Sequence, residues 1–253
     1  MDQLLWFGWF RADIIVEYAV LFWRGLQMTI LVTLICIVQG TVLGLAIGMA
    51  RLADARHAPA RQLCHYALRW PATVYVSFFR GTPLFVQILL IHFALLPLFI
   101  NPADGLLISG ETARNLKQNY GAFMSGVAAL TLNAGAYISE IFRAGIQSID
   151  RGQYEGARVL GMSYPQTMRR IVLPQVIKRI LPPLSNETIT LVKDTSLIYV
   201  LAMNDLLRAA RGIVQRDFTT TPFVVAAAFY LAMTLVLTLG FQHLEKKYAV
   251  YDE

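Results

Sequence analysis

Residues 26–50, LQMTILVTLICIVQGTVLGLAIGMA, contain no charged side chain. A bilayer core about 30 Å thick requires roughly 20 mainly apolar residues in helical form, so this segment is long enough to cross it. The whole chain fits that prediction, because 56% of its 253 residues are apolar, 15% are charged and the mean hydropathy is +0.52. Ordinary soluble domains carry about 25% charged residues, so the composition argues against a water-soluble enzyme.

We expect an all-α membrane protein with five spanning helices. The expected spans are residues 26–50, 84–100, 120–139, 183–205 and 223–243. Pro83 disfavours helix at the residue before it, so a helix break is predicted there. The segment 183–205 contains Glu187, Lys193 and Asp194. If it crosses the bilayer, its centre lies near the last two, and ionisable groups at that depth usually face a pathway or a partner.

Lysine and arginine fall unequally on the two sides of the five expected spans. Thirteen lie on one side and seven on the other, with Arg80 and Lys193 assigned to the membrane. Cytoplasmic segments of membrane proteins carry the excess of positive charge. The bias therefore predicts an N-terminus outside and a C-terminus in the cytoplasm. It also accounts for the net charge of +6 without a nucleic acid partner.

Glycine recurs at every fourth position in the first expected span, at Gly40, Gly44 and Gly48. These positions share one face of a helix and carry only hydrogen as side chain, so another helix can approach closely. We predict a packing seam on this face. The alternative is the general abundance of glycine in membrane helices.

The segment between the third and fourth expected spans, about residues 140–182, is too charged to lie in lipid. Gly152–Leu160 is typical of a short helix that ends at Gly161, because glycine adopts the left-handed C-cap conformation at little cost. Ser163 and Gln166 have the spacing of a capping box and predict the start of a second helix. Apolar side chains in this segment need covering, which favours two packed helices over a solvated basic loop.

Several short motifs follow one another along the chain. They are RGTP at 80–83, RAGIQSI at 143–149, Glu155-Gly156-Ala157, Gly161, IVLP at 171–174, LPPL at 181–184 and KDTSL at 193–197. The central ones are similar to the EAA-type coupling loop of bacterial ABC importers, and the full set resembles the polar amino acid permease family over roughly residues 20–245. Gly156 departs from the alanine usual in that family, at a cost of about 1 kcal/mol within a helix.

The resemblance implies a type I importer permease in the bacterial inner membrane, with residues 1–253 as a single transmembrane domain. It implies three protein partners: an ATP-binding subunit, a second permease that is the same chain or a sister chain, and a soluble substrate-binding protein. The residues implied to couple to the ATPase are Glu155, Gly156, Ala157 and Gly161. This sequence has no G-x-x-x-x-G-K-[ST] motif, so ATP and Mg are expected on the partner subunit. We expect no cofactor, metal or catalytic residue in this chain, which is then not itself an enzyme.

The resemblance also implies that a polar amino acid binds between membrane helices, at positions that match Lys193, Asp194, Thr195 and Ser196. Opposed charges and hydroxyl groups suit a zwitterion. Because adjacent side chains on a helix point about 100° apart, Lys193 and Asp194 cannot both face one pocket squarely. We favour Asp194, Thr195 and Ser196 as the residues near the ligand. The alternative is that these groups satisfy each other or cap a helix break.

Two polar side chains, one at the cytoplasmic end of the third expected span and one within the second, are assigned structural roles. Glu140 is expected to pair with Arg143 or Arg179 rather than to contact substrate. His92 is expected to be a hydrogen-bonded packing residue rather than part of the pathway.

Two other functions compete with the importer. A proton-coupled secondary transporter would be expected to show inverted repeats and several acidic residues inside its spans, whereas Asp194 is the one strong acidic candidate. A membrane enzyme would be expected to show a motif such as G-x-S-x-G or H-E-x-x-H, and the sequence contains neither. Both alternatives rank below the importer.

Overall fold

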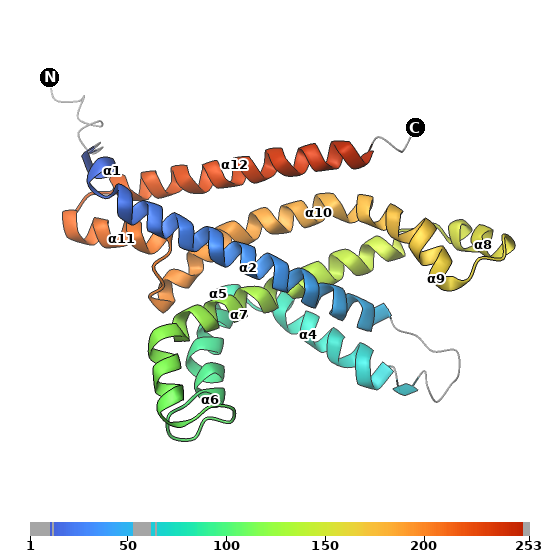
Figure 1. Cartoon of the computed structure of the whole chain (residues 1–253), viewed down its shortest axis with the longest axis horizontal. Helices are drawn as coiled ribbons and strands as arrows, with labels where there is room; N and C mark the ends of the chain where they lie inside the picture. Colours follow the sequence, from blue (N-terminus) through green and yellow to red (C-terminus); the bar gives the residue numbers. More distant parts are fainter. Residues whose placement is uncertain (1–10, 12, 53–61, 64, 250–253) are drawn as a thin grey trace. The chain divides into compact units, whose positions relative to one another are not determined.

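The chain folds as a series of helices (Figure 1). A computed structural model describes residues 11, 13–52, 62, 63 and 65–249. Its elements are α1 Asp13–Glu17, α2 Ala19–Leu52, η2 His65–Arg69, α4 Trp70–Gly81, α5 Leu84–Leu90, η3 Ile91–Leu95, α6 Leu96–Phe99, α7 Gly110–Gln147, α8 Arg151–Val159, α9 Tyr164–Thr167, η4 Met168–Val172, α10 Leu173–Asp194, η5 Thr195–Leu201, α11 Leu206–Asp217 and α12 Thr221–Ala249. These residues form no strand beyond one isolated bridge between Ile100 and Ile108, and the predicted all-α class is confirmed.

Three helices are long and apolar enough to cross a membrane, and each contains one of the expected spans. They are Ala19–Leu52, Gly110–Gln147 and Thr221–Tyr248. A fourth candidate is the pair Tyr66–Gly81 and Leu84–Phe99, whose axes meet at an angle of 111°. The break between its two parts contains Pro83, where a break was predicted. α10 is not among the helices that pass this test.

The outward face of α12 is strongly apolar. Only 11% of the residues in its most apolar stretch are buried, against 61% for α7. Leu231 is 69% exposed and Leu235 is 55% exposed. Surfaces of this kind are covered by lipid or by another subunit.

The helix expected over residues 183–205 has different bounds in the structure. α10 begins at Leu173 and ends at Asp194, and the chain continues from there as the 3₁₀ helix η5. Lys193 and Asp194 therefore lie at the end of the helix, and their expected position at its centre is wrong.

The early start of α10 follows from a buried stripe that the sequence reading treated as loop. Val172, Val176 and Ile180 recur at every fourth position and are all buried, as is typical of one face of a helix. Lys178 and Arg179 lie on other faces of the same helix, so their charges do not prevent it. An average of hydropathy over this segment is lowered by the two charges and does not reveal that Val172, Val176 and Ile180 share one buried face.

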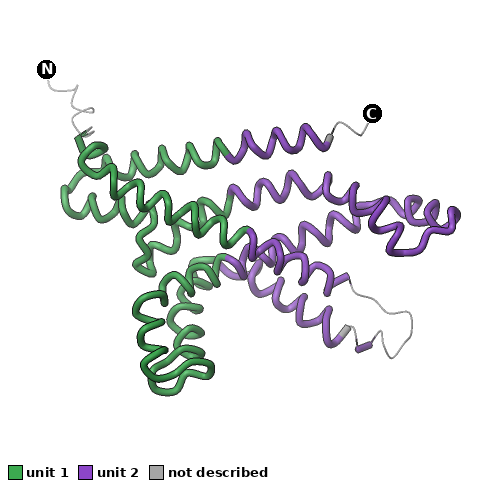
Figure 2. The backbone as a smooth tube through the Cα atoms, in the orientation of Figure 1, with its two compact units in different colours: residues 1–37, 84–130, 190–236 green, residues 38–83, 131–189, 237–253 purple. Residues whose placement is uncertain are grey.

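The helices form two compact units (Figure 2). The first unit comprises residues 1–37, 84–130 and 190–236, and the second unit comprises residues 38–83, 131–189 and 237–253.

In the second unit, the predicted glycine seam packs α2 against α7. A Cβ added to Gly44 would lie 2.7 Å from Ile138 Cγ2, and one added to Gly48 would lie 3.1 Å from the Ser139 carbonyl oxygen. A Cβ added to Gly40 would lie 3.2 Å from the Ala134 Cβ. The separation at Gly44 is too short for a real Cβ, so that position requires hydrogen, and a Cβ at Gly40 or Gly48 would make an unusually tight contact. The predicted packing seam is confirmed.

The core of the first unit is formed by the start of α2 with α1, α11 and α12. Its buried residues are Ile14, Tyr18, Phe22, Leu206, Ala210, Ile213, Val225 and Ala226. Gly25 permits the close approach of α2 to α11, because a Cβ there would lie 2.9 Å from Leu206 Cα. One turn further along α2, Thr29 Oγ1 accepts a hydrogen bond of 3.2 Å from the Leu206 amide. This contact fixes where α11 begins.

Candidate functional site

The loop between α7 and α10 folds as two short helices, as predicted; we call residues 150–172 the helical loop. The Asp150 carboxylate caps α8 by accepting a hydrogen bond of 2.6 Å from the Gly152 amide. Gly161 follows α8 with φ of +70°, a backbone conformation that glycine adopts with little strain. At the start of α9, the Ser163 amide donates to Gln166 Oε1 at 2.8 Å, as the capping box requires.

The helical loop is anchored by an apolar cluster in the second unit. Ile149, Val172, Val176 and Ile180 form the buried part of this cluster, and Tyr154 of α8 packs against it. Burial raises the pKa of the Tyr154 phenol, as expected for a ring packed against apolar neighbours. The loop is consequently a packed structure, and the alternative of a merely solvated basic segment does not hold.

The second helix of the loop leads directly into α10. The backbone keeps right-handed helical angles at Thr167, at Met168 and at Leu173, where α9, η4 and α10 meet. A helical path without a break therefore runs from Tyr164 into α10. A displacement of α9 must move the start of α10 with it.

The outer surface of the helical loop carries apolar side chains that nothing in the described chain covers. Val159 is 87% exposed, Leu160 is 77% exposed and Tyr164 is 68% exposed. Three of the four predicted coupling residues, Glu155, Gly156 and Gly161, are also exposed. The fourth, Ala157, is buried in the loop's own packing, with 2% of its surface exposed. Exposed apolar groups beside a charged one are typical of a protein-binding surface.

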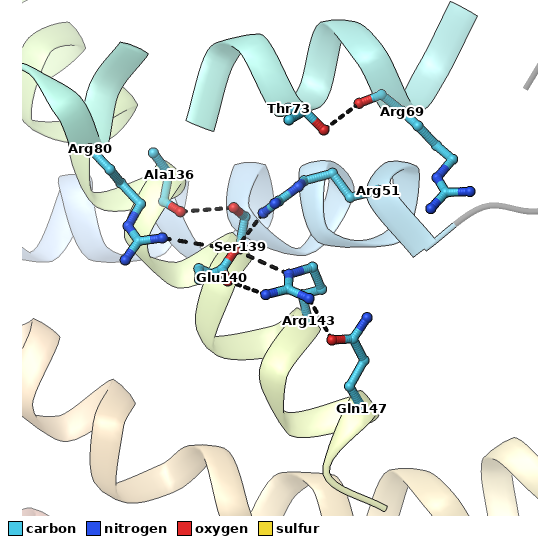
Figure 3. A network of polar contacts seen from close by, with 9 residues as sticks. All are labelled: Arg51, Arg69, Thr73, Arg80, Ala136, Ser139, Glu140, Arg143 and Gln147. Atoms are coloured by element: carbon cyan, nitrogen blue, oxygen red, sulfur yellow. Dashed lines mark hydrogen bonds and ion pairs between the residues drawn. The ribbon is translucent and has the colours of Figure 1, made fainter. Parts of the chain in front are cut away.

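A cluster of charges joins three elements of the second unit around Glu140 of α7 (Figure 3). Arg51 Nη1, at the end of α2, lies 2.5 Å from Glu140 Oε2. Arg143 Nε donates to the same oxygen at 3.1 Å, and its Nη2 group contacts Oε1. Arg80 of α4 lies 3.9 Å from the carboxylate and 5.3 Å from the centre of the Tyr137 ring. One carboxylate thus faces three guanidinium groups.

The prediction that Glu140 pairs with Arg143 is confirmed, and Arg179 has a different partner. The Arg179 side chain donates to the backbone carbonyl of Ser148, and its Nη1 lies 3.1 Å from Ser148 Oγ. Arg179 therefore ties α10 to the end of α7. His92 also takes the structural role expected for it, because its Nδ1 lies 2.7 Å from Ser125 Oγ.

The four residues predicted to bind substrate lie where α10 passes into η5, in the first unit. Lys193 is exposed, and Asp194 and Ser196 are half-buried. Thr195 is fully buried, and its hydroxyl donates to the Val192 carbonyl oxygen at 2.6 Å. The Thr195 hydroxyl thus bonds to the backbone at the end of α10. This agrees with the alternative that these polar groups cap a helix break.

The sequence reading missed the polar N-terminus of α11. Asp205 is fully buried, and its two carboxylate oxygens accept hydrogen bonds of 3.2 Å from the amides of Leu207 and Arg208. An aspartate immediately before an amphipathic run is a helix-start signal that could have identified this cap. Among the described residues, no group of three His, Cys, Asp or Glu side chains is arranged to hold a metal ion.

Apolar helices of spanning length and a two-helix loop that continues into α10 define a multi-pass membrane protein of the transporter class. Residues 64–250 match the family described as the binding-protein-dependent transport system inner membrane component. The chain belongs to this family of ABC transporter permeases.

Known relatives cover nearly the whole chain. It is 34% identical over 252 residues to the probable amino-acid ABC transporter permease protein YckA of Bacillus subtilis, covering 99% of both chains. It is 33% identical to the probable glutamine ABC transporter permease protein GlnM of the same organism, covering 94% of this chain and 97% of GlnM. The crystal structure of an amino acid ABC transporter with histidines matches with a TM-score of 0.74 at 34% identity, over 92% of this chain and 96% of that one. The type I permease fold expected from the sequence is thereby shown.

Proposed function

We propose that this chain is the membrane subunit of an ATP-driven importer of polar amino acids. The observation that carries the proposal is the helical loop: its exposed face is formed by α8, the turn at Gly161 and Tyr164, and Tyr164 begins the helix that continues into α10. An ATP-binding subunit, which holds ATP and Mg, would dock on this face. Glu155 supplies a polar contact and Gly161 the turn that follows α8, while Tyr154 anchors α8 to the apolar cluster and Ala157 is buried.

The membrane arrangement we propose has five spans. They are α2, the bent pair from Tyr66 to Phe99, α7, α10 with η5, and α12. In this arrangement residues 1–253 act as one transmembrane domain in the bacterial inner membrane, with the N-terminus outside and the C-terminus in the cytoplasm. A second permease, the same chain or a sister chain, would complete the pathway, and a soluble binding protein would deliver the substrate.

The proposed substrate is a polar amino acid, supported by the names of the relatives YckA and GlnM. Asp194 and Ser196 are half-buried at the end of α10, where a ligand can reach them. Lys193 supplies a cation next to them, and Thr195 holds the backbone of the turn through its bond to Val192. The Asp194 carboxylate suits the ammonium group of an amino acid and the Ser196 hydroxyl can donate to its carboxylate, while Lys193 adds positive charge nearby without facing the same pocket squarely.

The test is uptake by the complete transporter reconstituted in vesicles with its ATP-binding subunit, partner permease and binding protein. Glu155→Lys reverses the charge on the docking face, and we expect uptake and stimulated ATP hydrolysis to fall about tenfold or more, equivalent to at least 1.4 kcal/mol. Glu111→Lys is the matched control, because Glu111 is an exposed residue at the start of α7.

Two results would contradict the proposal. One is unchanged uptake by both the Glu155→Lys variant and a variant whose loop is replaced by a short linker, each shown by thermal unfolding to be folded. The other is uptake by this permease alone, driven by a proton gradient without ATP, which would favour a secondary transporter.

A further inference from the structure

A pocket of about 640 Å³ lies in the first unit, and none of the residues that line it belongs to the helical loop or to the Glu140 cluster. The polar residues among those that line it are Arg24, Tyr199, Asn204, Arg208, Arg211 and Gln215. Arg24 belongs to α2 and Tyr199 to η5. Arg208, Arg211 and Gln215 belong to α11. Its volume falls within the usual range of about 300–1,000 Å³ for small-molecule sites.

The described lining of the pocket is positively charged. It includes Arg24, Arg208 and Arg211, and none of its described residues is an aspartate or a glutamate. Across the residues that the structure describes, no carboxylate forms an ion pair with these three guanidinium groups. Asp205 is next to the pocket in sequence, but its carboxylate is buried and caps α11. A concavity lined by one sign of charge concentrates ligands of the opposite sign.

The arginines are held in place by the contact between α2 and α11. Gly25 brings α2 against the start of α11, with 2.9 Å between an added Cβ and Leu206 Cα, and this places Arg24 beside α11. Arg208 and Arg211 are three residues apart, so they share one face of α11. Arg211 lies 5.2 Å from the centre of the Tyr199 ring, a cation–π contact that orients its guanidinium group.

We propose that this pocket binds the carboxylate of the transported amino acid before it reaches Asp194 and Ser196. The inference rests on the proposed import function and adds a second site to it, at the outer end of the pathway. Planar guanidinium groups match a carboxylate with paired hydrogen bonds. The side-chain oxygens of Asn204 and Gln215 can accept from the ammonium group. With three cations and no acid, the pocket favours acidic and neutral amino acids over cationic ones.

The direct test compares an amino acid with its own carboxamide, which lacks the negative charge. The assembled transporter, purified without its binding protein, is heated in the presence of each of the twenty amino acids, and then with the carboxamide of each one that stabilises it. We expect an acidic or neutral amino acid to stabilise the complex, and its carboxamide to bind about tenfold or more weakly. Equal binding of acid and amide, or no stabilisation by any amino acid, overturns the proposal.

Variants then locate the effect. Arg24→Gln, Arg208→Gln and Arg211→Gln should each weaken amino acid binding by about tenfold, and the corresponding lysine variants by less. Arg114→Gln is the control, because Arg114 is exposed in the same unit and does not line the pocket. If the glutamine variants bind the amino acid normally but lose stimulation by the binding protein, the pocket is a protein-docking surface and the proposal is wrong.

Failure of this inference is distinguishable from failure of the import function. The acid and amide comparison needs no ATP, whereas import is measured by ATP-dependent uptake and its loss in Glu155→Lys. One result would separate the two: uptake that depends on Glu155, together with no stabilisation of the complex by any amino acid when the binding protein is absent. It would support the import function and contradict amino acid binding in the pocket.

Discussion

Arg51 at the end of α2 and Glu140 within α7 form an ion pair, with 2.5 Å between Nη1 and Oε2. Their side chains are only 16% and 23% exposed, so the pair is shielded from bulk water. Arg143 and Arg80 face the same carboxylate (Figure 3). The Glu140 carboxylate therefore compensates three cations, from α2, α4 and α7, that lie together in the second unit.

Replacing Glu140 by glutamine should destabilise the protein. The amide keeps the shape and one acceptor but leaves three guanidinium groups facing each other without a compensating charge, which costs about 2 kcal/mol. Thermal unfolding in detergent measures the loss, and Glu111→Gln is the exposed control. A second substitution, Arg51→Gln, should return part of the stability because it removes one unpaired cation. Equal unfolding temperatures for Glu140→Gln and the unmodified protein would show that the cluster contributes nothing.

The glycine seam gives a second prediction. Gly44→Ala places a methyl group 2.7 Å from Ile138 Cγ2, too close for two carbon atoms, so α2 and α7 must separate. Overpacking of this kind costs about 1–3 kcal/mol. Gly240→Ala in α12 is the matched control, because a Cβ there meets no atom within 4 Å. Ile138→Ala removes Cγ2, the carbon that the added methyl group meets, so the double variant Gly44→Ala with Ile138→Ala should lose less stability than the sum of the two single variants. Thermal unfolding of Gly44→Ala, Ile138→Ala, the double variant and Gly240→Ala decides whether this contact limits the approach.

Features encoded over a few residues could be predicted from the sequence. Gly40, Gly44 and Gly48 recur with the period of a helix face, and the predicted seam forms there. The Asp150 to Gln166 segment carries its own start, turn and cap signals: the first short helix was predicted within one residue of its bounds, and the start of the second at the capping box was predicted correctly. In each case the decisive interaction is local or follows from helical periodicity.

Features that depend on tertiary packing could not be predicted in the same way. The bounds of α10 depend on a buried stripe at Val172, Val176 and Ile180. The hydropathy of the segment does not reveal this stripe, because Lys178 and Arg179 lie in the same segment. The arginine pocket requires Arg24 and Arg208 to meet, although they are far apart in sequence. No pattern of sequence spacing relates such residues. They are brought together by the close approach of α2 to α11 at Gly25.

At Gly156, replacement of glycine by alanine is expected to raise stability, whereas the same replacement in the glycine seam is expected to lower it. A Cβ at this position meets no atom within 4 Å, and its φ is not in the left-handed region, so alanine fits without strain. Gly156→Ala should stabilise α8 by up to about 1 kcal/mol through its higher helix propensity. Gly161→Ala has equal space but a φ of +70°, and it should destabilise the loop by about 1–2 kcal/mol. Hydrogen exchange of the α8 amides measures both effects. Slower exchange in Gly161→Ala, or faster exchange in Gly156→Ala, would contradict this account.

At the start of α11, two side chains provide three oxygens that accept from three successive amides. Thr29 Oγ1 accepts from the Leu206 amide, and the Asp205 carboxylate accepts from the amides of Leu207 and Arg208. These amides belong to the first turn of a helix, where no intrahelical partner exists. Asp205→Ala removes two acceptors and should cost about 1 kcal/mol or more, whereas Asp205→Asn keeps one oxygen and should cost less.

Thr29→Val tests the remaining acceptor from the other helix. Valine has the shape of threonine but no hydroxyl, so the buried Leu206 amide would lose its acceptor, at a cost of about 1–3 kcal/mol. Thr29→Ser keeps the hydroxyl and should retain most of the stability. Hydrogen exchange at residues 206–208 separates the two substitutions: Thr29→Val should speed exchange chiefly at Leu206, and Asp205→Ala at Leu207 and Arg208. If both variants speed exchange uniformly across α11, the helix is held by its apolar face alone and these caps are incidental to where it begins.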